Sequence, residues 1–200
     1  MTPPSNNEAE RLWSEALEKE PENYRFMVTL GWVNWQKIVL RMSENPEEVI
    51  QKGLRLAKQS LSIRPDFASA LSLAVSLEMM MGNHEDACKR VEKIFRFAET
   101  TFDTALGAAA AQNCGDLEVA ISNYEYVFNS APHFSSWARN LYSYALVENG
   151  NFDKALNFFE AELQKEHAFG GFSQTMYLLS AFINKKRGDE KKAKEFFEKQ

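Results

Sequence analysis

The chain has 200 residues, of which 44% are hydrophobic and 26% are charged, a composition typical of a soluble folded protein with a sizeable core. Its formal net charge of -5 argues against nucleic acid or an anionic membrane surface as the main partner. No apolar run approaches the roughly 18 residues that a membrane-spanning helix needs, and residues 1–7 lack the pattern of a secretory signal. The sequence therefore predicts a cytoplasmic protein that binds neither nucleic acid nor membrane.

Helical patterns follow one another along nearly the whole chain, without sustained strand-like alternation. A small residue, a bulky residue four positions later and, in most units, a proline or a substitute twelve positions later recur along the chain. These sets begin at Ala9, Gly53, Ala87, Ala120, Ala155 and Ala193. Because a small side chain lets two helices cross closely, the repetition predicts an array of helical hairpins rather than a globule around one centre.

Glycines precede four of these small residues by five positions: Gly82, Gly115, Gly150 and Gly188. A glycine at this point supplies the left-handed conformation that ends the first helix of a hairpin. The polar residue that follows each glycine can cap the second helix. The clearest unit is 101–134, where an alanine-rich helix, the turn at Gly115 and a second helix with Tyr124 lead to Pro132.

This pattern resembles the tetratricopeptide repeat family, whose 34-residue hairpins carry a small residue, an aromatic residue and a terminal proline at these spacings. The resemblance implies an all-α, right-handed superhelical solenoid of about eleven helices, with a leading second helix followed by five hairpins. We expect a disordered leader at 1–7 and one solenoid domain at 8–200. The repeat units are expected at about 8–21, 22–65, 67–99, 101–132, 134–167 and 172–200.

Two spacings depart from this repeat, since the successive small residues are 44, 34, 33, 35 and 38 positions apart. The first excess predicts that both helices of the 22–65 hairpin are lengthened. Asn45 as cap, Pro46 at the first helical position and Glu48 three residues after the cap predict a helix start there. The second excess predicts a flexible loop at 168–172.

No constellation of catalytic or metal-binding residues stands out. His84, His133 and His167 lack a second ligand at the spacing of a helical metal pair, so no metal or other cofactor is expected. Cys88 and Cys114 are far apart in sequence and have no neighbouring base, which predicts two reduced, mostly buried thiols. We therefore expect a protein that is not an enzyme.

The resemblance also implies where a partner binds, because the first helices of the hairpins line the groove in this family. The candidate lining residues are Arg25, Val28, Trp32, Trp35, Gln36, Ser72, Ser76, Met79, Met80, Phe102, Ala109, Gln112, Asn113, Trp137, Asn140, Tyr144, Leu178, Phe182 and Lys185. Aromatic residues and methionines there suit a peptide or an amphipathic partner helix. Alternatively, they pack against the long first hairpin.

A narrower resemblance rests on three strings, at 30–32, 61–68 and 131–137, together with the extended hairpin. These features are similar to the repeat arrays C-terminal to class III adenylate cyclase domains or to winged-helix domains in bacterial signalling proteins. The resemblance implies a regulatory or partner-binding scaffold within a larger signalling protein. The alternative is an oligomerisation module that forms a homodimer through its terminal helices, where Phe196 and Phe197 are expected to be exposed.

Overall fold

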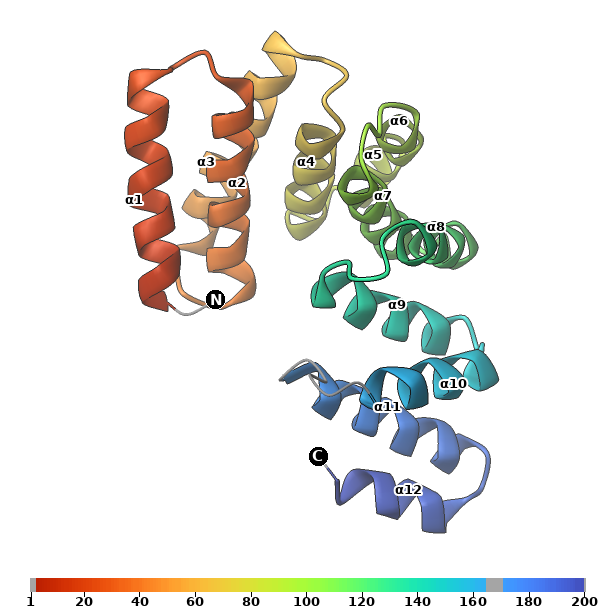
Figure 1. Cartoon of the computed structure of the whole chain (residues 1–200). Helices are drawn as coiled ribbons and strands as arrows, with labels where there is room; N and C mark the ends of the chain where they lie inside the picture. Colours follow the sequence, from red (N-terminus) through yellow and green to blue (C-terminus); the bar gives the residue numbers. More distant parts are fainter. Residues whose placement is uncertain (1–2, 165–170, 200) are drawn as a thin grey trace. The chain divides into compact units, whose positions relative to one another are not determined.

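The computed structural model describes residues 3–164 and 171–199, which contain helices and their connections but no strand (Figure 1). Contacts between residues divide the chain into two units, Met1–Ala110 and Ala111–Gln200. The described helices of the first unit are α1 (Pro3–Lys19), α2 (Tyr24–Val39), α3 (Pro46–Ile63), α4 (Ala68–Met80), α5 (His84–Cys88), α6 (Val91–Arg96) and, up to Ala110, α7 (Thr101–Asn113). The second unit contains the end of α7, then α8 (Leu117–Ser130), α9 (Ser136–Glu148), α10 (Phe152–Leu163), α11 (Gly171–Lys186) and α12 (Glu190–Phe197).

The all-α prediction is confirmed for the described ranges. The short helices α5 and α6 together take the place of one second helix, which is interrupted at Lys89 and Arg90. The Arg90 side chain reaches back to the buried carboxylate of Glu78 on α4. With α5 and α6 counted as one arm, the described helices agree with the eleven that were predicted.

The turns between the helices of a hairpin have the predicted backbone form. The glycine at four described turns has a φ between 74° and 82°: Gly82, Gly115, Gly150 and Gly188. Asp116 and Asp189 each accept a hydrogen bond from the backbone N–H three residues later, at 3.3 and 3.1 Å. Asn83 and Asn151 occupy the same cap position without such a bond. The glycine role is therefore confirmed at four turns and side-chain capping at two.

The helices α2 and α3 approach closely where each carries a glycine. A Cβ atom on Gly31 would lie 2.3 Å from Leu73 Cδ2, and one on Gly53 would lie 2.9 Å from Leu77 Cδ1. Both leucines come from α4 and are fully buried, so they fill the room that the two glycines leave. The close crossing predicted at Gly53 on α3 is present, and Gly31 is the small residue opposite it on α2.

The long hairpin is also confirmed, since α2 has 16 residues and α3 has 18, against 13 in α4. The predicted start of α3 has the expected cap. Asn45 Oδ1 accepts from the Glu48 N–H at 3.4 Å, and Pro46 occupies the first helical position.

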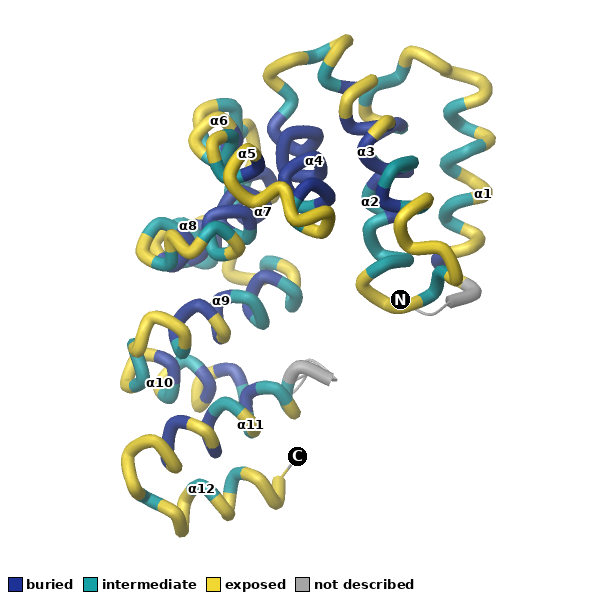
Figure 2. Tube along the Cα trace, turned by 180° about the vertical axis from the view of Figure 1, so that it is seen from behind, coloured by how far each residue is buried: buried dark blue, intermediate teal, exposed yellow. Residues whose placement is uncertain are grey.

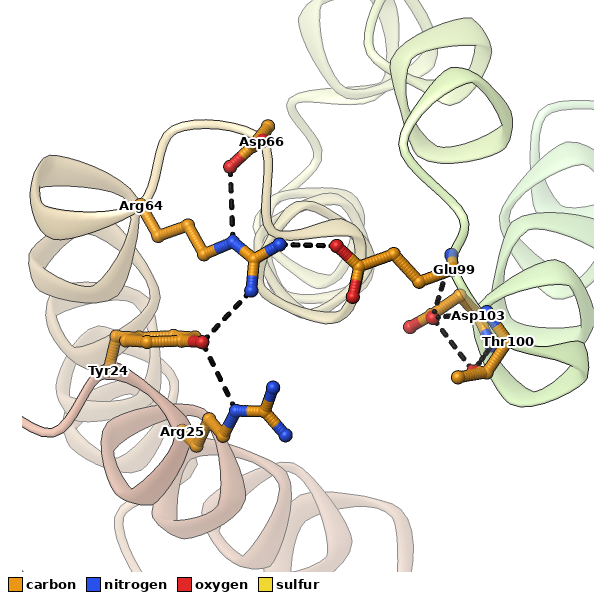
Figure 3. A network of polar contacts seen from close by, with 7 residues as sticks. All are labelled: Tyr24, Arg25, Arg64, Asp66, Glu99, Thr100 and Asp103. Atoms are coloured by element: carbon orange, nitrogen blue, oxygen red, sulfur yellow. Dashed lines mark hydrogen bonds and ion pairs between the residues drawn. The ribbon is translucent and has the colours of Figure 1, made fainter.

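Three connections of the first unit meet at Arg64, which lies between α3 and α4 (Figure 3). Its guanidinium donates to Asp66 Oδ1 at 3.2 Å and to Tyr24 Oη at 2.9 Å, and it pairs with Glu99. Hydrogen bonds from Arg25 and Arg64 lower the pKa of the Tyr24 phenol. Tyr24 begins α2, and Glu99 shortly precedes α7. One side chain therefore links the starts of three hairpins.

Aromatic rings fill the interior of the second unit between α8, α9 and α10. The ring centroid of Tyr142 on α9 lies 6.0, 5.5 and 4.9 Å from those of Tyr124, Phe128 and Phe158. Tyr124 is fully buried and Tyr142 nearly so, and burial raises the pKa of both phenols. Tyr124, the bulky residue of the clearest predicted hairpin, is thus part of this core.

A buried ion pair joins α9 to α10 beside these rings. Arg139 Nη1 lies 2.7 Å from Glu162 Oε1, and the side chains are only 6% and 4% exposed. The guanidinium carbon also lies 4.6 Å from the ring centroid of Phe128, and the group donates to the Pro132 carbonyl. Arg139 therefore holds α9, α10 and the α8–α9 connection together.

Three sequence-based expectations need correction or lie outside the described residues. The prediction of a disordered leader at 1–7 is wrong for residues 3–7, because α1 begins at Pro3. Asn6 is buried there, and its Nδ2 donates to Gln36 Oε1 on α2 at 3.2 Å. The expected reduced thiols are wrong as well, since Cys88 and Cys114 are both disulfide-bonded. A disulfide depends on distance in the fold, which sequence spacing does not give. Of the loop expected at 168–172, residues 171–172 begin α11 and the rest lies outside the described residues.

We expect Arg139→Met to lower the free energy of unfolding by roughly 3 to 5 kcal/mol, because it removes the buried guanidinium that pairs with the buried Glu162 carboxylate. Urea denaturation followed by circular dichroism measures this loss. Lys154→Met is the control, since Lys154 pairs with Glu125 at the surface and is 51% exposed. The control should cost less than about 1 kcal/mol, and an equally small loss for Arg139→Met would contradict the role assigned to the pair.

Candidate functional site

The predicted lining residues lie on α2, α4 and α7 in the first unit and on α7, α9 and α11 in the second. In the first unit, Val28 and Ser72 are only 2% and 1% exposed, so their side chains belong to the core. Trp32 and Trp35 pack against the core cluster of α2, α3 and α4, with their ring centroids 5.6 Å apart. Trp32 Nε1 also donates to Ser69 Oγ on α4 at 3.2 Å. These contacts correspond to the packing role that the sequence left open.

The other predicted residues of the first unit have mixed surroundings. Arg25 Nε donates to Tyr24 Oη at 3.1 Å, and Gln36 accepts from Asn6. Met79 packs against the core formed around α4, α6 and α7. Ser76 and Ala109 are half-buried, whereas Met80 and Phe102 are exposed. Burial is extensive along α4 in particular (Figure 2).

The second unit presents a different surface. Tyr144 on α9 and Leu178 and Phe182 on α11 are 38%, 43% and 45% exposed. The two helices contact each other and run in the same direction (Figure 1). Leu178, Phe182 and Lys185 are spaced four and three residues apart and so share one side of α11. We call Tyr144, Leu178, Phe182 and Lys185 the α9–α11 face.

The remaining predicted residues of the second unit lie around this face or near the end of α7. Trp137 and Asn140 are half-buried on α9, and the Trp137 ring centroid is 6.0 Å from that of Phe134. Gln112 accepts a hydrogen bond from Tyr124 Oη and donates to Glu148, both at 3.3 Å. Asn113 is exposed at the end of α7.

Tyr144 and Phe182 occupy equivalent places, since each lies six residues before the positive-φ glycine of its turn. The same place holds Ser76 on α4 and Ala109 on α7. At this position the side chain is therefore small on α4 and α7 and large and aromatic on α9 and α11. These positions can be found in the sequence by counting six residues back from each turn glycine.

Positive charge gathers beside the α9–α11 face. Lys185 and Lys186 are exposed, and neither makes an ion pair with a described residue. Lys186 Nζ lies 5.6 Å from the centroid of the Phe182 ring. Arg187, in contrast, pairs with Asp153 at 2.7 Å. Lys186 is not among the predicted lining residues, but its contact with Phe182 places it beside the face.

The described residues show neither a metal-binding cluster nor a membrane-spanning helix. Across 3–164 and 171–199, no three or more His, Cys, Asp or Glu side chains are grouped so that they could hold a metal ion. Within those ranges, every helix is too short or too polar to cross a membrane. His84 and His133 are exposed, and His167 lies outside the described residues.

The sequence matches no protein-family model, and no curated protein matches it. Solved structures with similar folds include PilW, a widely conserved type IV pilus biogenesis factor, at 16% identity and a TM-score of 0.69, covering 96% of this chain and 82% of that one. YrrB, described as a TPR protein with an unusual peptide-binding site, has 14% identity and a TM-score of 0.57, covering 92% and 88%. Human IFIT1, solved as a dimer with PPP-AAAA, has 17% identity and a TM-score of 0.73, covering 99% of this chain and 46% of that one.

At these identities the likeness concerns the fold. The chain has the all-α fold of tetratricopeptide repeat proteins, as the sequence predicted. These structures do not support the narrower resemblance to arrays associated with adenylate cyclases.

We expect Trp32→Ala and Phe182→Ala to affect stability differently. Trp32 packs on the core and bonds to α4, so its loss should lower the free energy of unfolding by roughly 2 to 5 kcal/mol. Phe182 is 45% exposed, and its loss should cost less than about 1 kcal/mol. Chemical denaturation measures both, and equal losses would contradict the assignment of one ring to the core and the other to a surface.

Proposed function

We propose that this chain is a non-catalytic protein-interaction scaffold and that the α9–α11 face binds a peptide or helix of a partner protein. The observation that carries the proposal is the exposure of three large apolar side chains on two adjacent helices: Tyr144, Leu178 and Phe182. Aromatic rings supply large contact area with few rotatable bonds, which suits recognition. The tetratricopeptide-repeat fold and the peptide-binding site named for YrrB support the same class of function.

The proposal concentrates on the second unit because the burial patterns differ. In the first unit, the predicted tryptophans already have partners within the core. On the α9–α11 face, burying a Leu or Phe side chain under a partner gains roughly 1.5 to 3 kcal/mol for each fully covered residue. The three side chains together can therefore provide the apolar centre of a small interface.

A peptide selection tests this function. We expect a random phage-displayed peptide library, panned on the 200-residue chain, to yield peptides whose affinity falls about tenfold or more in Tyr144→Ala and Phe182→Ala. Fluorescence anisotropy with the synthesised peptides measures the change.

Tyr126→Ala is the matched control, because Tyr126 is 57% exposed but lies on α8, outside the face. It should leave affinity within about twofold. Failure to select any peptide, or peptides that bind all variants equally, would overturn the proposed function.

A second candidate is self-association through α12, which has no buried residue (Figure 2) and carries Phe197 at 57% exposure. Sedimentation velocity over a range of concentrations separates this candidate from the first. A monomer whose sedimentation coefficient is unchanged by Phe197→Glu excludes self-association through α12.

The resemblance to arrays of bacterial signalling proteins adds a regulatory role as a narrower hypothesis.

A further inference from the structure

We infer that the α9–α11 face selects an acidic partner segment, in which carboxylate side chains stand next to apolar anchors. The inference rests on the proposed function, since it names the chemistry of the partner that the face would bind. Two observations carry it: two lysines at one end of the face that have no carboxylate partner among the described residues, and the positive charge of residues 171–200, which include α11.

Lys185 and Lys186 are the first observation. Both are exposed at the end of α11, and neither is neutralised by a carboxylate among the described residues. Two other cations nearby are paired: Arg187 with Asp153, and Lys192 with Asp189. Both ammonium groups therefore lack a carboxylate partner within the described part of the chain, and that of Lys186 lies beside Phe182.

The second observation is the local charge balance. Residues 171–200 contain seven Lys or Arg and four Asp or Glu, a net charge of +3, whereas the whole chain carries -5. A positive region on a negative chain attracts acidic segments locally while the rest of the surface repels them. This arrangement favours a partner whose acidic residues lie over α11.

The contact between Lys186 and Phe182 indicates where the acidic residues of the partner should lie. Lys186 Nζ lies 5.6 Å from the ring centroid, within reach of a cation–π interaction. A partner side chain that packs on Phe182 consequently brings its neighbours within reach of Lys186. We therefore expect at least one Asp or Glu within about one helical turn of the apolar residue that covers Phe182.

A peptide fits this surface better than a nucleic acid does. Tyr144 and Phe182 could stack on bases, but Leu178, four residues before Phe182 on α11, offers an aliphatic side chain that suits an apolar peptide residue better. Acidic residues on α12, among them Glu190 and Glu195, are interleaved with the lysines and would repel a continuous phosphate backbone. Binding of an oligonucleotide is accordingly an outcome that would count against the inference.

The test uses the peptides selected on the wild-type chain. We expect them to be enriched in Asp and Glu next to their apolar residues, and we expect Glu→Gln or Asp→Asn versions to bind more weakly. Lys185→Gln and Lys186→Gln should each lower the affinity of the acidic peptide about two- to fivefold. The effect should shrink between about 0.05 and 0.5 M sodium chloride, because salt screens exposed charges.

Lys191→Gln is the matched control, since Lys191 is an exposed lysine on α12, outside the face, with no ion pair to a described residue. It should change affinity by less than either variant on α11. The inference would be overturned by peptides whose affinity depends on Tyr144 and Phe182 but which contain no acidic residue. It would also be overturned if Lys185→Gln and Lys186→Gln left that affinity unchanged, and in both cases the proposed function would still stand. Tighter binding of a single-stranded oligoadenylate than of any selected peptide would overturn both, whereas selection of no peptide would overturn the proposed function first.

Discussion

The constraint on which the rest of this structure depends is the close crossing of helices at small residues. Ala57, Ala87, Ala120 and Ala155 have no exposed surface, and the Gly31–Gly53 crossing leaves room that the α4 leucines fill. Because neighbouring helices approach this closely, the spacing between small residues sets the spacing of the hairpins. The side chains of the second helices, and those of the first helices that face them, are therefore buried in the packing between helices. The side chains that can vary are those at the outward positions of the first helices, and the two units carry different side chains there.

In the first unit, the tryptophans at those positions pack against neighbouring helices, whereas Met80 and Phe102 are exposed. Trp32 bonds to α4 through Ser69, and the Arg64 network links the connections outside the core. In the second unit, an aromatic interior around Tyr142 and the Arg139–Glu162 pair supplies the stability. Tyr144, Leu178 and Phe182 are consequently not needed for the core, which leaves them available for recognition.

The sequence was sufficient for the features that depend on the backbone. The turn glycines, the small residues and the Asn45 cap each act within a few residues of chain, so their spacing predicted the fold. It was insufficient where a side chain finds a partner far along the chain. Asn6 is buried and donates a hydrogen bond to Gln36, and Cys88 and Cys114 are disulfide-bonded although their sequence spacing gave no reason to expect it. For the candidate site, the family rule selected the first helices of the hairpins but could not separate the packed Trp32 from the exposed Phe182.

Hydrogen–deuterium exchange of the 200-residue chain, with and without a saturating selected peptide, tests the central claim most directly. The account predicts that protection on binding is concentrated in peptic fragments covering α9 and α11, because a segment seated on the α9–α11 face restrains those helices. Protection centred on α2 and α4, or on α12 alone, with none at α9 and α11 would contradict it.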